Sequence, residues 1–168
     1  EGLASLKLDA IVTTCTRSTR VMHNAIRSTA LGMAAVSDPV GQGLIASYAR
    51  PGGNITGLAS QFEDIAAKML GLLREAVPAA SPVAVVSNSR NPVHRTFLRE
   101  LEAAARPLGV RLVPVEVGLT TDLAATFAGM VRDGIASVLV LPDDPVLIHL
   151  RRKLVQTAAK HRMPSFFG

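Results

Sequence analysis

The sequence predicts an α/β fold in which short parallel strands alternate with helices. The chain has 168 residues and is 48% hydrophobic but only 4% aromatic, so Ala, Val and Leu must build most of its core. Its β-branched apolar runs are short, and segments with apolar residues at helical spacing separate them. Strands separated by helices require right-handed crossovers, and these give parallel sheets with helices on both faces.

Two strands and one helix are predicted in the first part of the chain. Residues 9–14 and 31–36 are suited to buried strands, and a helix is expected at about residues 18–28 between them. A glycine-rich stretch, SDPVGQGLIASYARPGGNITGLAS, follows the second strand. Within it we expect Pro39 to start a short helix with Asp38 as its N-cap.

The remainder of the chain alternates more regularly. Four helices are expected, beginning near residue 62, at Pro92, after Thr120 or Thr121, and at Pro145. Four strands are expected, at residues 83–86, 110–115, 135–141 and 164–167. Asp144 precedes Pro145 and is a typical N-cap. Leu72 and Leu108 fall on the apolar stripes of their helices, so we expect both to face the core.

These elements divide the chain unevenly. Residues 58–168 hold enough strands and helices for most of one lobe, whereas residues 1–57 hold too few for a closed lobe. We therefore expect a boundary between residues 57 and 58, and we expect the chain to be an excerpt of a longer protein. Uncovered strand edges tend to recruit another chain, so we also expect dimerisation through residues 1–57.

Composition excludes several classes of function. The formal net charge is +5, but the basic residues are dispersed and no basic run is interleaved with aromatics, so nucleic-acid binding is not predicted. No apolar run approaches the ~20 residues of a membrane-spanning helix. Cys15 is the only cysteine, and the four histidines are scattered through predicted helices. We therefore expect no metal site, no cofactor and no catalytic residues, and we expect the histidines at the surface.

Polar residues follow the predicted strands, at the edge where parallel sheets bind their ligands. The candidate ligand-binding residues are Thr14, Thr16, Ser37, Asp38, Asn88, Ser89, Asn91 and Asp143. Carboxylates beside hydroxyls and amides suit a zwitterionic amino acid, with Asp38 for the ammonium group and donors such as Thr16 and Ser89 for the carboxylate. Structural alternatives stay open: Asp38 as a helix cap, and residues 88–91 as a turn that caps the helix at Pro92.

One competing motif lies in the glycine-rich stretch. Residues 41–46, GQGLIA, match the dinucleotide-binding fingerprint with Ala as its last member. That fingerprint needs its first glycine directly after a strand, but residues 37–40 intervene. Glu63, at the distance of the expected ribose ligand, falls in a predicted helix. We therefore interpret these glycines as residues of chain reversal and close packing.

Three segments, DAIVTTCT, AAVSDPVGQGLIASYARPGGNITGLAS and VAVVSNSRNP, resemble the ABC-transporter substrate-binding protein family whose characterised members bind tryptophan or tyrosine. The resemblance implies a type I periplasmic-binding fold with two lobes and a solute cleft at the hinge. It implies that residues 1–57 end the first lobe and that residues 58–168 form most of the second. It also implies a periplasmic location and delivery of the solute to a membrane permease.

One residue departs from the pattern of the family. Cys15 stands where the family usually has Gly, and a side chain there would narrow the cleft or change its preference. We expect Cys15 to be a packing residue at the cleft edge rather than a nucleophile.

Three functions stay open at this point. A solute receptor with no chemistry of its own fits best. A ligand-sensing domain of the same fold in a signalling protein is not distinguished by these residues. A nucleotide-dependent enzyme would need a phosphate-binding loop and a catalytic pair, and the sequence supplies neither.

Overall fold

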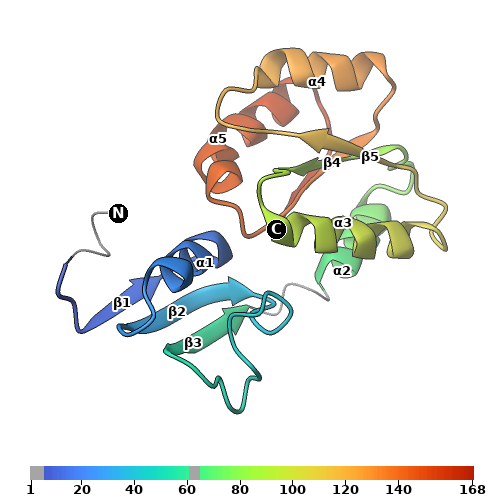
Figure 1. Cartoon of the computed structure of the whole chain (residues 1–168). Coiled ribbons are helices and arrows are strands. Elements are labelled where there is room, and N and C mark those ends of the chain that lie inside the picture. Colours follow the sequence, from blue (N-terminus) through green and yellow to red (C-terminus); the bar gives the residue numbers. More distant parts are fainter. Residues whose placement is uncertain (1–5, 61–64) are drawn as a thin grey trace. The chain divides into compact units, whose positions relative to one another are not determined.

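The described strands form two separate parallel sheets, and these divide the chain into two units (Figure 1). The structure, a computed structural model, describes residues 6–60 and 65–168. Unit 1 spans Glu1–Phe62 and unit 2 spans Glu63–Gly168. Every strand pair in both sheets is parallel, which confirms the predicted α/β class. No helix in the described ranges is long and apolar enough to cross a membrane.

Unit 1 contains a three-stranded sheet in the order β1-β2-β3. Its elements are β1 (Ala10–Thr13), α1 (Thr16–Ala25), β2 (Ala30–Ser37) and β3 (Ile55–Ser60). Ile11, Leu31 and Ile55 lie side by side across the three strands. They are buried in one apolar cluster, and Met22 of α1 and Ile26 pack against it. Helix α1 therefore covers this face of the sheet.

Strand β3 was not expected from the sequence, because it lies within the glycine-rich stretch and glycine is unusual inside a strand. Gly57 has a φ of 139° and faces Met33 of β2 so closely that an added Cβ would lie 2.0 Å from the Met33 carbonyl oxygen. Only glycine fits this approach. Strand β3 also spans the expected boundary between residues 57 and 58, and unit 1 extends to Phe62. The assignment of unit 1 to the first lobe and of unit 2 to the second lobe stays a prediction.

The helix expected at Pro39 is also absent from the structure. Residues 39–43 form a hydrogen-bonded turn, in which the N–H of Gln42 bonds to the Asp38 carbonyl and the N–H of Leu44 bonds to the Pro39 carbonyl. Asp38 has a φ of 45°, which is left-handed backbone rather than the extended geometry of an N-cap. The turn ends in buried Leu44 and Ile45, which join the core of unit 1.

Unit 2 contains a four-stranded sheet in the order β5-β4-β6-β7. Its strands are β4 (Val83–Ser87), β5 (Leu112–Glu116), β6 (Ser137–Val140) and β7 (Ser165–Phe167). Its helices are α2 (Ile65–Ala76), α3 (Pro92–Ala105), α4 (Leu123–Arg132) and α5 (Pro145–Lys160). Helices α2 and α3 lie on one face of the sheet and α4 and α5 on the other (Figure 1).

The core of unit 2 surrounds β4 and β6. Every residue of β4 is buried, as expected for a central parallel strand with helices on both faces. On one face Ala84 and Val86 pack with Phe127 of α4 and Leu154 of α5. Phe97 of α3 is fully buried as well. This packing fixes where the carboxyl ends of β4 and β6 lie, and with them the loops that follow.

Some local predictions in unit 2 were wrong. The N-cap of α4 is Asp122, whose carboxylate accepts the N–H of Ala125, whereas Thr121 accepts the N–H of Gly118. Leu108 is exposed because α3 ends at Ala105 before reaching it, and Leu72 of α2 is exposed too. The cap was missed because Thr and Asp are both good N-caps and they stand next to each other.

One face of the sheet in unit 1 is uncovered by the described residues. Side chains alternate along a strand, so Val12 of β1 and Leu58 of β3 point away from the buried Ile11 and Ile55. Val12 is 72% exposed and Leu58 is 71% exposed. Parallel sheets are normally covered on both faces, and the predicted helices on both faces are found in unit 2 only.

This exposed apolar face should make the chain self-associate. We expect a dimer or larger species in light scattering, and we expect the double substitution Val12→Lys and Leu58→Lys to shift the chain toward the monomer, because charged side chains oppose burial of the face. Ile148→Lys is the matched control, since Ile148 is an equally apolar exposed residue of α5 in unit 2. A monodisperse monomer of the unmodified chain would contradict the expectation.

Candidate functional site

Hydroxyl groups join the carboxyl ends of the strands in unit 1. Thr16, at the start of α1, is buried, and its Oγ1 accepts the N–H of Ser37 at 3.0 Å. The Ser37 hydroxyl bonds to the Ser60 hydroxyl at 3.1 Å. The structure therefore brings the predicted residues Thr16 and Ser37 together. It adds Ser60, which the sequence could not suggest because β3 was not expected.

Asp38 presents its carboxylate from the loop after β2. Its Oδ1 accepts the N–H of Gly41 at 2.8 Å. A Cβ added to Gly41 would lie only 2.0 Å from Asp38 Oδ2, so the carboxylate rests directly against this glycine. The side chain is half-buried. Gly41 is thus needed for the position of the carboxylate rather than for phosphate binding.

Cys15 and Thr14 lie at the turn between β1 and α1. Cys15 is half-buried and is the N-cap of α1, since its Sγ accepts the N–H of Ser18 at 3.4 Å. The expected packing role therefore becomes a capping role, while its place at a cleft edge stays a prediction. Thr14 is exposed.

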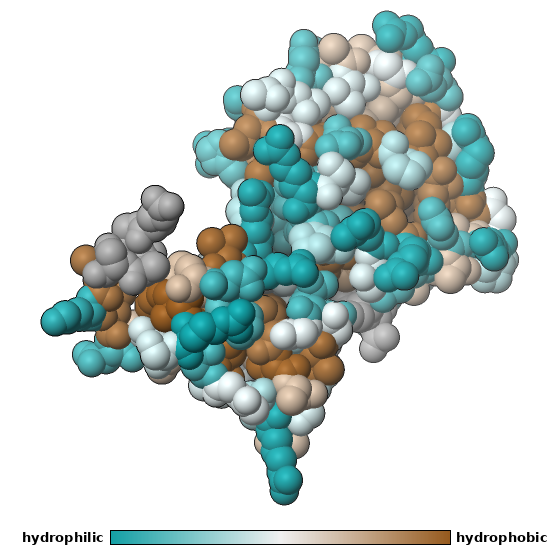
Figure 2. All heavy atoms as spheres, in the orientation of Figure 1, coloured by the Kyte–Doolittle hydropathy of each residue, from teal (hydrophilic) through white to brown (hydrophobic). Residues whose placement is uncertain are grey.

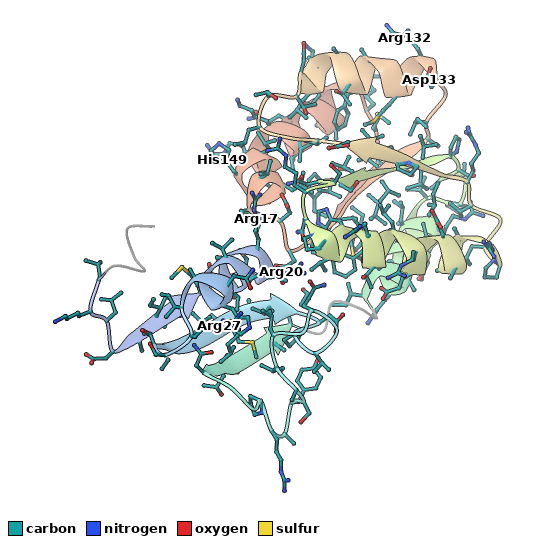
Figure 3. The ribbon with its side chains drawn as sticks, viewed as in Figure 1. Arg17, Arg20, Arg27, Arg132, Asp133 and His149 are labelled. Atoms are coloured by element: carbon teal, nitrogen blue, oxygen red, sulfur yellow. The ribbon has the colours of Figure 1, made fainter. Side chains whose placement is uncertain are left out.

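Helix α1 also carries two arginines, Arg17 and Arg20 (Figure 3). The Arg20 guanidinium donates a hydrogen bond to Gln42 Oε1 at 3.2 Å.

A buried carboxylate organises the corresponding edge of unit 2. Asp144 is 1% exposed and is the N-cap of α5, as predicted. Its Oδ1 accepts the N–H groups of Val146 at 2.9 Å and Leu147 at 3.0 Å. Its Oδ2 accepts the side-chain amides of Asn88 at 3.0 Å and Asn91 at 3.3 Å. The carboxylate therefore joins the end of β4, the start of α3 and the first turn of α5.

Asn88 and Asn91 are brought together by the structure, but their amides serve the protein itself. Both are buried. Asn91 is also the N-cap of α3, accepts the N–H of Val93 at 3.2 Å and donates to the Asp143 carbonyl at 2.6 Å. Asn88 Oδ1 accepts the N–H of Arg90 at 3.1 Å. Their contact with a solute stays a prediction, and this geometry favours a supporting role.

His94, which was expected at the surface, is 1% exposed. Its Nδ1 accepts the N–H of Asn88 at 2.9 Å, so the ring proton lies on Nε2, which donates to the Pro142 carbonyl at 2.9 Å. Burial lowers the pKa of His94 below its ordinary value of 6.5, although the Pro142 carbonyl and the charges of Asp144 and Asp143 act in the opposite direction. The expectation was wrong because a loop distant in sequence covers this helix.

Ser89 and Asp143 are the accessible candidates of unit 2. Ser89 is exposed, and its hydroxyl donates to Glu116 at the end of β5. Asp143 is half-buried and has a φ of 58°. Both residues lie in loops that the buried Asn88 and Asp144 hold in place. Glu116 was not among the predicted site residues, although it directly follows a predicted strand, at residues 110–115.

Grooves elsewhere in unit 2 offer a different location for a ligand. Two of them, of about 230 and 460 Å³, flank the edge strand β5 on its α3 and α4 sides. Figure 2 shows hydrophobic surface there, beside β4 and β5. None of the predicted site residues lines either groove. We favour the carboxyl edge, because open parallel sheets bind ligands beyond the carboxyl ends of their strands. Within the described ranges, no three His, Cys, Asp or Glu residues are grouped to hold a metal ion.

The network around Asp144 should contribute strongly to stability. Asp144→Ala leaves two backbone N–H groups and two buried amides without their acceptor, so we expect unfolding free energy in urea to fall by about 3 kcal/mol or more. Asp122→Ala is the matched control, because it removes an exposed cap that is worth about 1 kcal/mol. Equal losses for the two variants would show that the buried amides do not depend on Asp144.

Acid should destabilise the fold through His94. The unfolded chain takes up this proton near pH 6.5, whereas the folded chain takes it up only at lower pH, because burial lowers the pKa of the ring. The stabilising contribution is therefore complete above pH 6.5 and is lost as pH falls through the folded pKa. Urea unfolding from pH 7.5 to 5.0 should show a smaller slope with pH in His94→Phe than in the unmodified chain. An identical slope would contradict this assignment.

Comparisons with known proteins show the family of this chain. The sequence matches the family described as ABC transporter substrate binding protein over residues 2–167. The tyrosine-binding protein of Clostridioides difficile (strain R20291) is 26% identical over 158 residues, which make up 94% of this chain and 45% of that relative. The family consists of substrate-binding proteins rather than enzymes.

Solved structures of this kind share the fold. The ABC domain in complex with L-Trp from Streptococcus pneumonia has a TM-score of 0.86 at 22% identity, with 99% of this chain and 55% of that chain covered. The ligand-free, open substrate binding protein with adhesive properties from Clostridium difficile has a TM-score of 0.62 at 24% identity, with 99% and 55% covered. These likenesses confirm the predicted type I periplasmic-binding-like fold. The chain spans about half the length of these relatives. It belongs to the ABC transporter substrate binding protein family.

Proposed function

We propose that this chain binds a small solute, an amino acid, for an ABC uptake transporter. The observation that carries the proposal is the Asp38 carboxylate, which Gly41 holds in a fixed position at the carboxyl edge of unit 1. A fixed carboxylate that is partly open to solvent is suited to an ammonium group, and a charge-assisted hydrogen bond of this kind is among the stronger ones in proteins.

The other accessible candidates supply complementary chemistry. The Thr14 hydroxyl is exposed and can donate to a solute carboxylate. The Ser89 hydroxyl already donates to Glu116 and can accept a hydrogen bond from an ammonium group. Asp143 adds a second carboxylate from unit 2. Thr16, Ser37, Asn88 and Asn91 are buried, and we assign them to the support of these loops.

The relatives suggest which amino acids to test first. One relative is named for tyrosine binding, and one solved structure holds L-Trp. We therefore propose an aromatic amino acid as the solute. ABC substrate-binding proteins work outside the cytoplasm with a membrane permease, and we propose a periplasmic location and a permease partner for this protein too.

Asp38→Asn should weaken binding without unfolding the chain. Asn tolerates left-handed backbone and can still accept the Gly41 N–H, so the substitution removes mainly the charge. A hydrogen bond to a charged group is worth roughly 1.5–3 kcal/mol, and we expect affinity for L-Trp or L-Tyr in calorimetry to fall by about 10- to 100-fold. Asp133→Asn is the control, because it removes an equal charge from the exposed end of α4 (Figure 3).

Gly41→Ala tests whether the position of the Asp38 carboxylate matters, without changing Asp38 itself. The added methyl group displaces the Asp38 side chain, so affinity should fall as it does in Asp38→Asn. Gly53→Ala is its control, because nothing lies within 4 Å of a Cβ at that position. The proposal fails if neither L-Trp, L-Tyr nor L-Leu binds the unmodified protein, or if both variants bind as tightly as it does.

A further inference from the structure

His94 adds a further link between two loops that Asn88 and Asn91 already join through their hydrogen bonds to Asp143 and Asp144. Through Nδ1 it is bonded to the Asn88 N–H in the loop of residues 88–91, after β4. Through Nε2 it is bonded to the Pro142 carbonyl in the loop of residues 141–144, after β6. These loops carry Ser89 and Asp143, the two accessible candidates of unit 2. The imidazole ring is therefore a bridge between them.

The bridge requires one protonation state. A backbone N–H can only donate, so Nδ1 must be unprotonated to accept it, and Nε2 must carry the proton. A protonated ring would place two N–H groups against each other at the Asn88 contact. The ring is 1% exposed, so water is not at hand to replace the lost bond.

Two carboxylates act on the imidazole, and one aromatic ring lies beside it. The charges that act on it are those of Asp144 and Asp143, both from the loop of residues 141–144. Asp144 already accepts four hydrogen bonds. The Phe97 ring lies beside the imidazole, with centroids 6.3 Å apart. A second ring proton would break the hydrogen bond from the Asn88 N–H, because a protonated Nδ1 cannot accept it.

We propose that His94 is a positioning residue for solute binding: as a neutral ring it ties the loop that carries Ser89 to the loop that carries Asp143, and its protonation loosens both. This inference rests on the proposed function, since it assumes that these loops contact the solute. His94 itself touches no solute in this account. It acts through the two loops.

The first experiment measures affinity for L-Trp and L-Tyr from pH 7.5 to 5.0. We expect affinity of the unmodified protein to fall toward the acid end of this range, in step with protonation of the His94 ring. His94→Phe keeps the ring volume and loses both bonds, so it should bind at least 10-fold more weakly at pH 7.5 and lose most of the pH dependence. His94→Gln keeps a donor for the Pro142 carbonyl and should bind with intermediate affinity. His149→Gln, on the outer side of α5 (Figure 3), should keep the unmodified profile.

The second experiment needs no solute. In NMR spectra of the unmodified protein, the ring nitrogens should report the Nε2–H tautomer at neutral pH, and the amide signals of Ser89 and Asp143 should shift with the same midpoint as the His94 ring. If His94→Phe does not fold, this titration still tests whether protonation of His94 changes the two loops. Loop amides that do not follow the ring would overturn the proposal.

The outcomes separate the two proposals. Failure of all probes to bind the unmodified protein, with loop amides that still follow His94, would reject the proposed solute and keep the positioning role. Binding that stays constant while the His94 ring titrates in the NMR spectra, or a folded His94→Phe with unchanged affinity and profile, would reject the positioning role and keep the proposed function.

Discussion

The carboxylate of Asp144 is the interaction on which the candidate edge of unit 2 depends. A carboxylate that is almost fully buried is costly unless its oxygens are satisfied, and here four N–H groups satisfy them. The donors come from three different elements. One interaction thus fixes the end of β4, the start of α3 and the start of α5 at once, and with them the positions of Ser89 and Asp143.

The carboxyl edge of unit 1 is held together mainly by hydroxyl groups, which form weaker hydrogen bonds than a buried carboxylate does. The Thr16 and Ser37 hydroxyls join α1, β2 and β3, and Gly41 supports the Asp38 carboxylate. In both units the polar residues at the carboxyl edge therefore separate into two sets. Buried residues hold the loops, and exposed or half-buried residues present their polar groups to solvent. From the sequence both sets were candidate ligands, with capping as the open alternative for Asp38 and for residues 88–91, because a polar residue that follows a strand can serve either role.

The sequence predicted what depends on local signals. The apolar run of β4 and the Asp144-Pro145 start of α5 are local, and both were found where expected. The burial of Asn88 depends on a partner 56 positions away, and that of His94 on Pro142, 48 positions away. Strand β3 depends on pairing with β2 and on the close approach of Gly57. Such non-local contacts are not encoded in any short window of sequence.

The backbone gives independent support for the two carboxylates. Among the described residues, left-handed φ angles occur outside glycine only at Asp38, Asp143 and Arg162, with values of 45°, 58° and 54°. For most L-residues this conformation costs roughly 1–2 kcal/mol, whereas Asp adopts it more readily because its short side chain can form local hydrogen bonds. Arg162 follows the C-terminal end of α5, where such a residue commonly ends a helix. The two aspartates instead follow strands, one in each unit, at the edge where ligands bind. At Asp38 the side chain has a task that glycine cannot perform, because it accepts the N–H of Gly41. Binding of a cationic group by the two aspartates stays a proposal.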